Sequence, residues 1–155
     1  MRPERLRGTR LSEAAIELIP DGMRTPECFR VMRQLRPHLT EADFVERIAA
    51  QRRQGYQLLA AVVDGQPAAL AGFRVMENLA WGRFVYVDDL VTDEQRRSRG
   101  YGGLLLEWLV DYCRDNGLAE LHLDSGVQRF GAHRFYLEKR MEITCHHFAL
   151  KIVSR

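Results

Sequence analysis

Residues 97–103 read Arg97-Ser98-Arg99-Gly100-Tyr101-Gly102-Gly103 and lie between an apolar strand pattern and an amphipathic helix pattern. The strand pattern covers residues 84–91, and the helix pattern begins near Tyr101. Glycine lets the backbone come close to a ligand, and the first turn of a helix offers unpaired N–H groups and the positive end of the helix dipole. The segment is therefore predicted to hold a phosphate group.

The segments around it carry alternating strand and helix signals. Thr40-Glu41-Ala42-Asp43 matches a capping box, which predicts the start of a helix, and Asp64-Gly65 is a strong signal for a hairpin turn. A proline or a glycine ends several of the other patterns. The predicted strands cover residues 14–20, 56–63, 66–75, 83–92, 118–124 and 143–152, and the predicted helices cover residues 25–35, 40–54, 101–115 and 131–138.

This order of elements predicts the fold class. Three successive strands with short links indicate an antiparallel meander, and the later strand–helix–strand series indicates a right-handed parallel crossover. We therefore expect an α/β (α+β) fold with a mixed twisted sheet, in the order β-α-α-β-β-β-α-β-α-β. The 155 residues are enough for a single domain with its own core, and we expect the polar residues 1–10 to be loosely attached to it.

The composition narrows the range of partners. Lys and Arg number 23 against 21 for Asp and Glu, so the chain has no global basic field for nucleic acid. No apolar run approaches the ~20 residues that a membrane span needs, and residues 1–7 lack the apolar core of a signal peptide. Cys28, Cys113 and Cys145 are odd in number and widely spaced, which favours neither a disulfide framework nor a zinc site. We expect a cytoplasmic protein without nucleic-acid or membrane partners.

Three phosphate-binding motifs compete for residues 97–103. A P-loop needs GxxxxGK[ST], and no lysine follows these glycines. A dinucleotide fingerprint needs GxGxxG in a first strand–helix turn, whereas Gly100-Tyr101-Gly102 is followed directly by Gly103 and comes after three antiparallel strands. The third motif, [Q/R]-x-x-G-x-[G/A], matches residues 97–102.

This third motif resembles the acetyl-CoA-binding motif of the GCN5-related N-acetyltransferase (GNAT) superfamily. The resemblance extends to Asp89-Leu90-Val91-Thr92 ahead of it, where the family has its cofactor-binding strand, and to Phe135-Tyr136 after the next strand. By motif it covers about the last half of the chain, and by the order of elements nearly all of it. The resemblance implies acetyl-CoA as co-substrate and no metal.

The resemblance also implies roles for individual residues. The backbone N–H groups of residues 97–103 would donate hydrogen bonds to the CoA pyrophosphate. Tyr136 stands where the family has a tyrosine that protonates the departing thiolate. Arg140-Met141 stand where the family commonly has Gly-Phe, which leaves the geometry of the turn after this helix open. The backbone that pairs with the pantetheine arm would come from Leu90, Val91 and Thr92.

Two neighbouring carboxylates, Asp88 and Asp89, are candidates for the general base, and the sequence does not decide between them. Successive strand residues face opposite sides of a sheet, so at most one of the two points into the cleft unless a bulge intervenes. The alternative is that one carboxylate caps a backbone turn and the other is solvated. His146 and His147 cannot both face one side of a strand, and we expect structural or exposed roles for them rather than a metal site.

The function implied by the resemblance is an N-acetyltransferase. It would transfer an acetyl group from acetyl-CoA directly to a primary amine of a small molecule or peptide, within a ternary complex and without an acyl-enzyme. Two alternatives stay open: a CoA-binding module of the same fold without catalysis, and a nucleic-acid binder built on Arg97 and Arg99. A homodimer could form through the apolar alternation of Phe148, Leu150 and Ile152.

Overall fold

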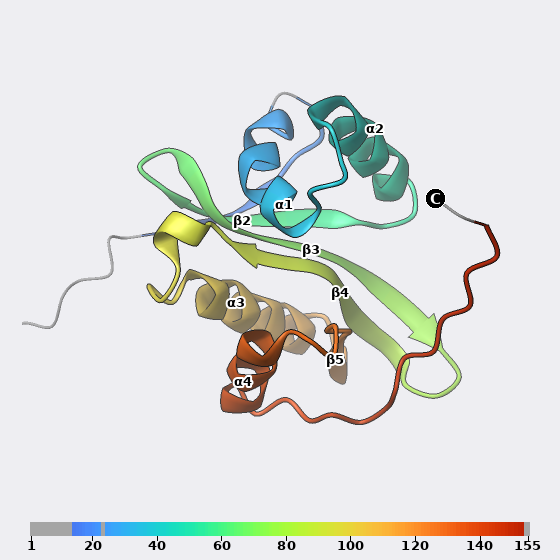
Figure 1. Ribbon diagram of the computed structural model, residues 1–155. Helices are drawn as coiled ribbons and strands as arrows, with labels where there is room; N and C mark the ends of the chain where they lie inside the picture. Colours follow the sequence, from blue (N-terminus) through green and yellow to red (C-terminus); the bar gives the residue numbers. More distant parts are fainter. Residues whose placement is uncertain (1–13, 23, 154–155) are drawn as a thin grey trace, which may run out of the picture. The chain divides into compact units, whose positions relative to one another are not determined.

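The computed structural model describes residues 14–22 and 24–153, so the segment predicted to be loose, residues 1–10, lies outside the described residues (Figure 1). The chain divides into two compact units, one that runs to His122 and one that begins at Leu123. The second unit contains one helix, α4 (Phe130–Glu138), within its described residues. The elements before α4 are, in chain order, β1 (Ala15–Ile19), η1 (Pro26–Cys28), α1 (Phe29–Leu35), α2 (Glu41–Arg52), β2 (Gln57–Val63), β3 (Gln66–Asn78), β4 (Gly82–Thr92), η2 (Glu94–Arg96), α3 (Tyr101–Asp115) and β5 (Glu120–Leu123).

The first unit is built on a five-stranded sheet in the order β1-β2-β3-β4-β5. Strands β1 to β4 pair antiparallel, which confirms the predicted meander. Asp64 and Gly65 have φ angles of 51° and 73°, so the tight turn predicted between β2 and β3 is present. Because α3 crosses over between β4 and its neighbour β5, the sheet is mixed, as expected.

The helices α2, α3 and α4 lie within two residues of their predicted bounds, whereas the helix predicted over residues 25–35 is divided into η1 and α1. The Thr40 side chain accepts a hydrogen bond from the Asp43 N–H, and the Asp43 carboxylate accepts one from the Thr40 N–H, which completes the capping box of α2. The helix α3 ends before Gly117, whose φ of +64° stops it. Within the described residues, no helix combines the length and apolarity needed to cross a membrane.

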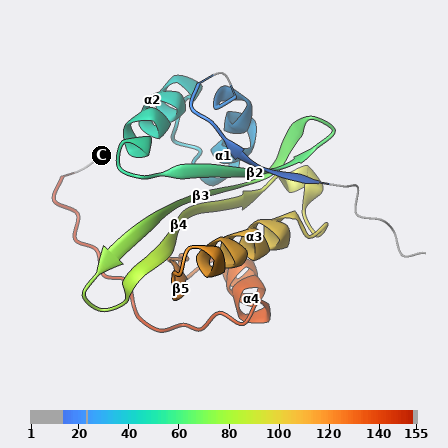
Figure 2. The same ribbon diagram turned by 180° about the vertical axis from the view of Figure 1, so that it is seen from behind.

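Helices cover both faces of this sheet (Figures 1 and 2). On one face α1 and α2 pack against the strands, where Phe44 of α2 joins Leu58 of β2 in the core. On the other face α3 packs against β3, where the rings of Tyr112 and Phe73 lie 5.4 Å apart. Because both faces are covered, residues 58–63 of β2 and 67–73 of β3 are buried continuously rather than in alternation.

The strand β4 contains a bulge that simple alternation does not predict. Asp89 pairs with Gly72 of β3, whereas Val87 pairs with the next residue, Phe73, so Asp88 is the extra residue on β4. A bulge of this kind re-aims the side chains on either side of it. It allows Asp88 and Asp89 to face the same side of the sheet.

The helix α4 ends in a left-handed turn although the residue there is an arginine. Arg140 has a φ of +64°, and its N–H donates to the Leu137 carbonyl at 2.9 Å. The Met141 N–H donates to the Tyr136 carbonyl at 3.0 Å. These two bonds form a Schellman motif, in which glycine is the usual residue. The turn that the sequence left open is therefore a regular helix end.

The strand predicted at residues 143–152 is wrong, so the order of elements ends at α4. Residues 141–151 have no regular secondary structure, and Phe148, Leu150 and Ile152 are 90%, 83% and 82% exposed. Apolar alternation marks a segment that can form a strand, but a strand also needs backbone hydrogen bonds from a neighbour. Among the described residues this segment has no such neighbour. The homodimer expected through it stays a prediction.

Candidate active site

Asp89 is held at both of its carboxylate oxygens. Its Oδ1 accepts from Nε of Arg36 at 2.9 Å, and its Oδ2 accepts from the Tyr56 hydroxyl at 3.0 Å. Nη2 of Arg36 also donates to the Asp88 carbonyl, at 3.0 Å. Arg36 follows α1 and Tyr56 precedes β2, so these bonds tie β4 to the face of the sheet that α1 covers. With both oxygens engaged, Asp89 is better suited to hold its neighbours than to take up a proton.

Asp88 is held at one oxygen. Its Oδ2 accepts from Nε of Arg74 at 2.9 Å, and Nη2 of Arg74 donates to Gln51 of α2 at 2.9 Å. No described residue donates a hydrogen bond to Oδ1 of Asp88. Burial raises the pKa of Asp88 above its usual value, although Arg74 acts to lower it. A partly buried carboxyl group with a raised pKa and an open oxygen has the properties of a general base.

Gly72 makes room for the Tyr56 hydroxyl. A Cβ atom at Gly72 would lie 1.8 Å from that hydroxyl oxygen, far inside van der Waals contact. Tyr56 is 2% exposed. Its burial, and to a smaller extent the negative charge of Asp89, raise its pKa well above the usual value. The hydroxyl therefore stays neutral and donates to Asp89. We call the set Arg36, Tyr56, Arg74, Asp88 and Asp89 the acid cluster.

Sequence reasoning missed three members of the acid cluster, Arg36, Tyr56 and Arg74. They come from three segments that only the sheet and its helices bring together. The one available signal was Gly72, because a glycine inside an apolar strand pattern marks a bulge or a close approach of another group.

Residues 97–103, which we call the glycine turn, enter α3 through left-handed backbone. Ser98 has a φ of +60°, and Gly100, with a φ of +81°, is the N-cap of the helix. The Leu104 N–H donates to the Gly100 carbonyl at 3.0 Å, so the N–H of Gly102 precedes the first bond within the helix. The positive end of a 15-residue helix therefore faces the glycine turn, as an anion site requires.

The arginine side chains of the glycine turn are exposed. In the part of the chain that the structure describes, Arg97 and Arg99 take part in no hydrogen bond or ion pair. Two guanidinium groups beside a helix N-terminus create a local positive region in a chain whose formal net charge is only +2. Guanidinium groups donate paired hydrogen bonds that match phosphate oxygens, so the region suits a phosphate ligand.

The C-terminal part of β4 extends beyond the end of its shorter neighbour β5. It has 11 residues, whereas β5 has 4. The His122 ring of β5 packs on Phe84, near the start of β4, with the ring centroids 5.0 Å apart. At about 3.3 Å per residue, Leu90 lies about 20 Å further along β4. Residues 90–92 pair with β3 at one edge, and β5 does not reach their other edge.

Tyr136 lies on α4, in the second unit. Burial raises the pKa of its hydroxyl above the usual value, and Arg129 offsets part of this rise. The hydroxyl therefore keeps its proton at neutral pH, which an acid catalyst requires.

The histidine pair near the end of the described chain is exposed, as predicted for His146 and His147. Nδ1 of His147 lies 3.5 Å from Oδ2 of Asp124. Among the described residues, no three His, Cys, Asp or Glu side chains are grouped so that they could hold a metal ion.

Known proteins resemble the chain over most of its length. Residues 24–141 match the Acetyltransferase (GNAT) family. The uncharacterized N-acetyltransferase YhdJ of Bacillus subtilis (strain 168) is 35% identical over 114 residues, which cover 73% of this chain and 80% of that protein.

Two solved structures share the fold. A putative acetyltransferase from Agrobacterium tumefaciens str. C58 has a TM-score of 0.77 at 22% identity and covers 88% of this chain and 99% of its own. An aminoglycoside N-acetyltransferase in complex with CoA has a TM-score of 0.77 at 16% identity and covers 96% of this chain and 98% of its own. The family match and the B. subtilis relative show that the chain belongs to the GNAT family of acetyl-CoA-dependent N-acetyltransferases.

Proposed function

We propose that the chain transfers an acetyl group from acetyl-CoA directly to a primary amine of a small molecule or peptide, within a ternary complex. The observation that carries the proposal is the glycine turn, whose exposed arginines have no partner among the described residues and whose backbone opens α3. We also propose that the two units act as one catalytic domain over residues 1–155. The family match supports this, because residues 24–141 include parts of both units.

The donor site follows from the two backbone features of the first unit. The glycine turn would bind the CoA pyrophosphate through backbone N–H groups, with Arg97 and Arg99 adding charge. The pantetheine amides would pair with the backbone edge of residues 90–92 that β5 does not reach, as an added strand. Backbone groups bind in this way whatever their side chains are, so the apolar residues Leu90 and Val91 are compatible with the role.

The base is the member of the carboxylate pair with an open oxygen. Asp88 has a raised pKa and an unbonded Oδ1, and we propose that it accepts a proton from the acceptor ammonium. Asp89 is bonded at both oxygens, and we assign it a positioning role for Arg36 and Tyr56. This division chooses between two residues that the sequence left open as candidates for the base.

The proposed reaction needs no covalent enzyme intermediate. The acceptor ammonium gives a proton to Asp88, and the free amine nitrogen then forms a bond to the thioester carbonyl carbon. The carbon–sulfur bond breaks, and the departing thiolate takes the proton of the Tyr136 hydroxyl. The amide nitrogen loses its extra proton to the Tyr136 phenolate, and Asp88 releases its proton to water, so both residues return to their starting state.

The test measures CoA release from acetyl-CoA with a panel of amines, together with CoA affinity by calorimetry. The variants are Tyr136→Phe and Asp88→Asn, compared with the parent. A clear loss of turnover in both variants at unchanged CoA affinity supports the proposal. CoA binding without turnover on any amine would favour the non-catalytic binding module, and salt-dependent binding to DNA or RNA in place of CoA would favour the nucleic-acid binder.

A further inference from the structure

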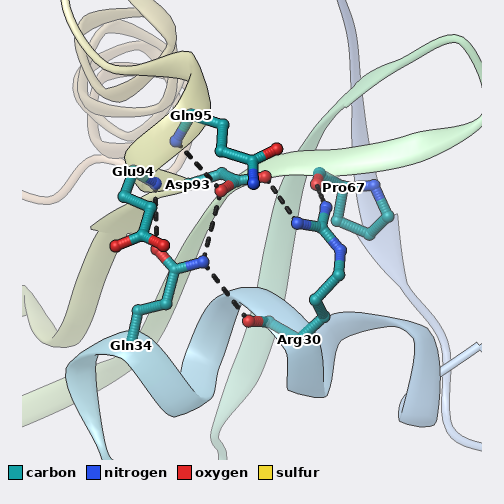
Figure 3. A network of polar contacts seen from close by, with 6 residues as sticks. All are labelled: Arg30, Gln34, Pro67, Asp93, Glu94 and Gln95. Atoms are coloured by element: carbon teal, nitrogen blue, oxygen red, sulfur yellow. Dashed lines mark hydrogen bonds and ion pairs between the residues drawn. The ribbon is translucent and has the colours of Figure 1, made fainter.

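Asp93 is a buried carboxylate at the junction between β4 and the glycine turn (Figure 3). Its side chain is 2% exposed. Nη1 of Arg30 donates to its Oδ2 at 2.5 Å, and Nε2 of Gln34 and the Gln95 N–H donate to its Oδ1 at 3.2 Å and 3.3 Å. Its own N–H donates to the Ala68 carbonyl at 2.9 Å. Backbone and side chain are thus both fixed at this residue.

Arg30 and Gln34, the two residues of α1 that bond to Asp93, each form a further hydrogen bond to the backbone of another segment. Oε1 of Gln34 accepts from the Glu94 N–H at 2.9 Å, and Nη2 of Arg30 donates to the Pro67 carbonyl at 3.0 Å. Figure 3 shows α1 joined in this way to the start of β3 and to the segment that enters the glycine turn. Burial by itself would raise the pKa of Asp93, but the hydrogen bonds from Arg30, Gln34 and the backbone outweigh it and lower the pKa, so the carboxylate stays charged.

The first three residues of the glycine turn lack such support among the described residues. The side chains of Arg97, Ser98 and Arg99 are exposed, and no described residue forms a hydrogen bond or ion pair with them. The conformation of residues 97–99 therefore depends on what flanks them, which is the start of α3 on one side and the Asp93 junction on the other.

The helix α1 also supports the acid cluster. Arg36, directly after α1, holds Asp89 on β4, while Arg30 and Gln34 on α1 hold Asp93 just beyond the end of β4. One short helix thus fixes the two carboxylates that flank residues 90–92.

We propose that Arg30, Gln34 and Asp93 form a positioning network that presets the glycine turn for CoA and links its conformation to α1. The proposal rests on the proposed role of the glycine turn as the CoA site. These side chains bond to residues 93–95, which precede the glycine turn, so they act by reducing the conformational freedom that CoA binding would otherwise have to remove. None of them is assigned contact with CoA.

The experiment measures CoA affinity by calorimetry for the parent, Gln34→Met, Asp93→Asn and the double variant. Each single change should weaken CoA binding about tenfold, which corresponds to the loss of one charge-assisted hydrogen bond. The double variant should be weakened by much less than the product of the single effects, because both residues act through one network. Hydrogen exchange should accelerate in residues 94–103 and not in β2. Gln34 is partly exposed and its replacement by Met keeps its length, so this variant can be measured if Asp93→Asn does not fold.

The matched control is Glu17→Gln, which breaks an ion pair of the same length, 2.5 Å to Nη1 of Arg24. That pair joins β1 to the segment before η1 and has no contact with the Asp93 junction, so CoA affinity should be unchanged. CoA affinity within twofold of the parent in both single variants would overturn the positioning network and leave the proposed function standing. A parent protein that does not bind CoA would overturn both.

Discussion

The glycine turn and the acid cluster are built in opposite ways. In the glycine turn the backbone conformation determines the shape of the site, and the arginine side chains have no partner among the described residues. In the acid cluster hydrogen bonds between side chains determine the shape, since the Asp89 carboxylate accepts from Arg36 at 2.9 Å and from Tyr56 at 3.0 Å. A backbone site of the first kind fits a ligand that does not vary, and a side-chain site of the second kind can be altered one residue at a time.

The largest expected effect is on the acid cluster, and it concerns turnover. Asp88→Asn should lower kcat by about 10²–10⁴, the range typical of removing a general base, because the amide cannot take the proton of the acceptor ammonium. CoA affinity should not change, since the donor site does not use this side chain. Turnover with the best amine of the panel and CoA calorimetry measure the two quantities. The control is Asp111→Asn, which breaks an exposed ion pair of 2.8 Å with Arg114 on α3. Equal turnover for Asp88→Asn and the parent would remove Asp88 from the mechanism.

The second prediction tests whether the acid cluster depends on packing. Gly72→Ala should lower the free energy of unfolding by about 1–3 kcal/mol, because the new methyl group must displace the Tyr56 ring. Urea unfolding measures this loss, and the CoA affinity of the folded protein should be retained. Gly131→Ala is the matched control, since a Cβ atom there would meet no atom within 4 Å outside its chain neighbours and its own helix backbone. An unchanged unfolding free energy for Gly72→Ala would show that the Tyr56 ring can move to another position without loss of stability.

The same contrast explains what could be predicted from the sequence. The glycine turn, the capping box at Thr40 and the Asp64-Gly65 turn were predictable, because each depends on residues adjacent in sequence. The acid cluster was not, because the bulge at Asp88 changes which way its neighbours point and Arg36 comes from a distant helix end.

One turn that the sequence left open and one strand that it predicted wrongly have the same origin. The backbone at Arg140 keeps a left-handed helix end that usually needs glycine, so residue type alone could not decide the geometry of that turn. The apolar alternation of residues 143–152 predicted a strand, but pairing depends on a neighbour that a pattern within one segment does not identify.

The third prediction concerns the glycine turn. Replacing both Arg97 and Arg99 by Gln should weaken CoA binding about tenfold in low salt, because two charged donors to phosphate are lost. The difference from the parent should shrink as salt is raised, since exposed charges are screened. Calorimetry at two salt concentrations measures both effects, and kcat at saturating acetyl-CoA should stay near the parent value. Arg114→Gln, at the other end of α3, is the control. A loss of kcat without a loss of CoA affinity would contradict the assignment of this region to the donor.

The smallest expected effect returns to Asp88, now in stability against pH. Because burial raises its pKa in the folded protein, the folded state binds its proton more tightly than the unfolded chain does. The resulting stability is present below the unfolded carboxyl pKa of about 3.9 and is lost as the pH rises through the higher folded value. The Asp88→Asn variant lacks this carboxyl group and so does not lose stability in this way. The unfolding free energy of the variant minus that of the parent should therefore increase as the pH rises from acid to neutral. Urea unfolding at several pH values measures the trend. Asp88→Asn is also the change expected to lower kcat most. If the variant lost stability and activity in parallel at neutral pH, the carboxylate would support the fold rather than the reaction.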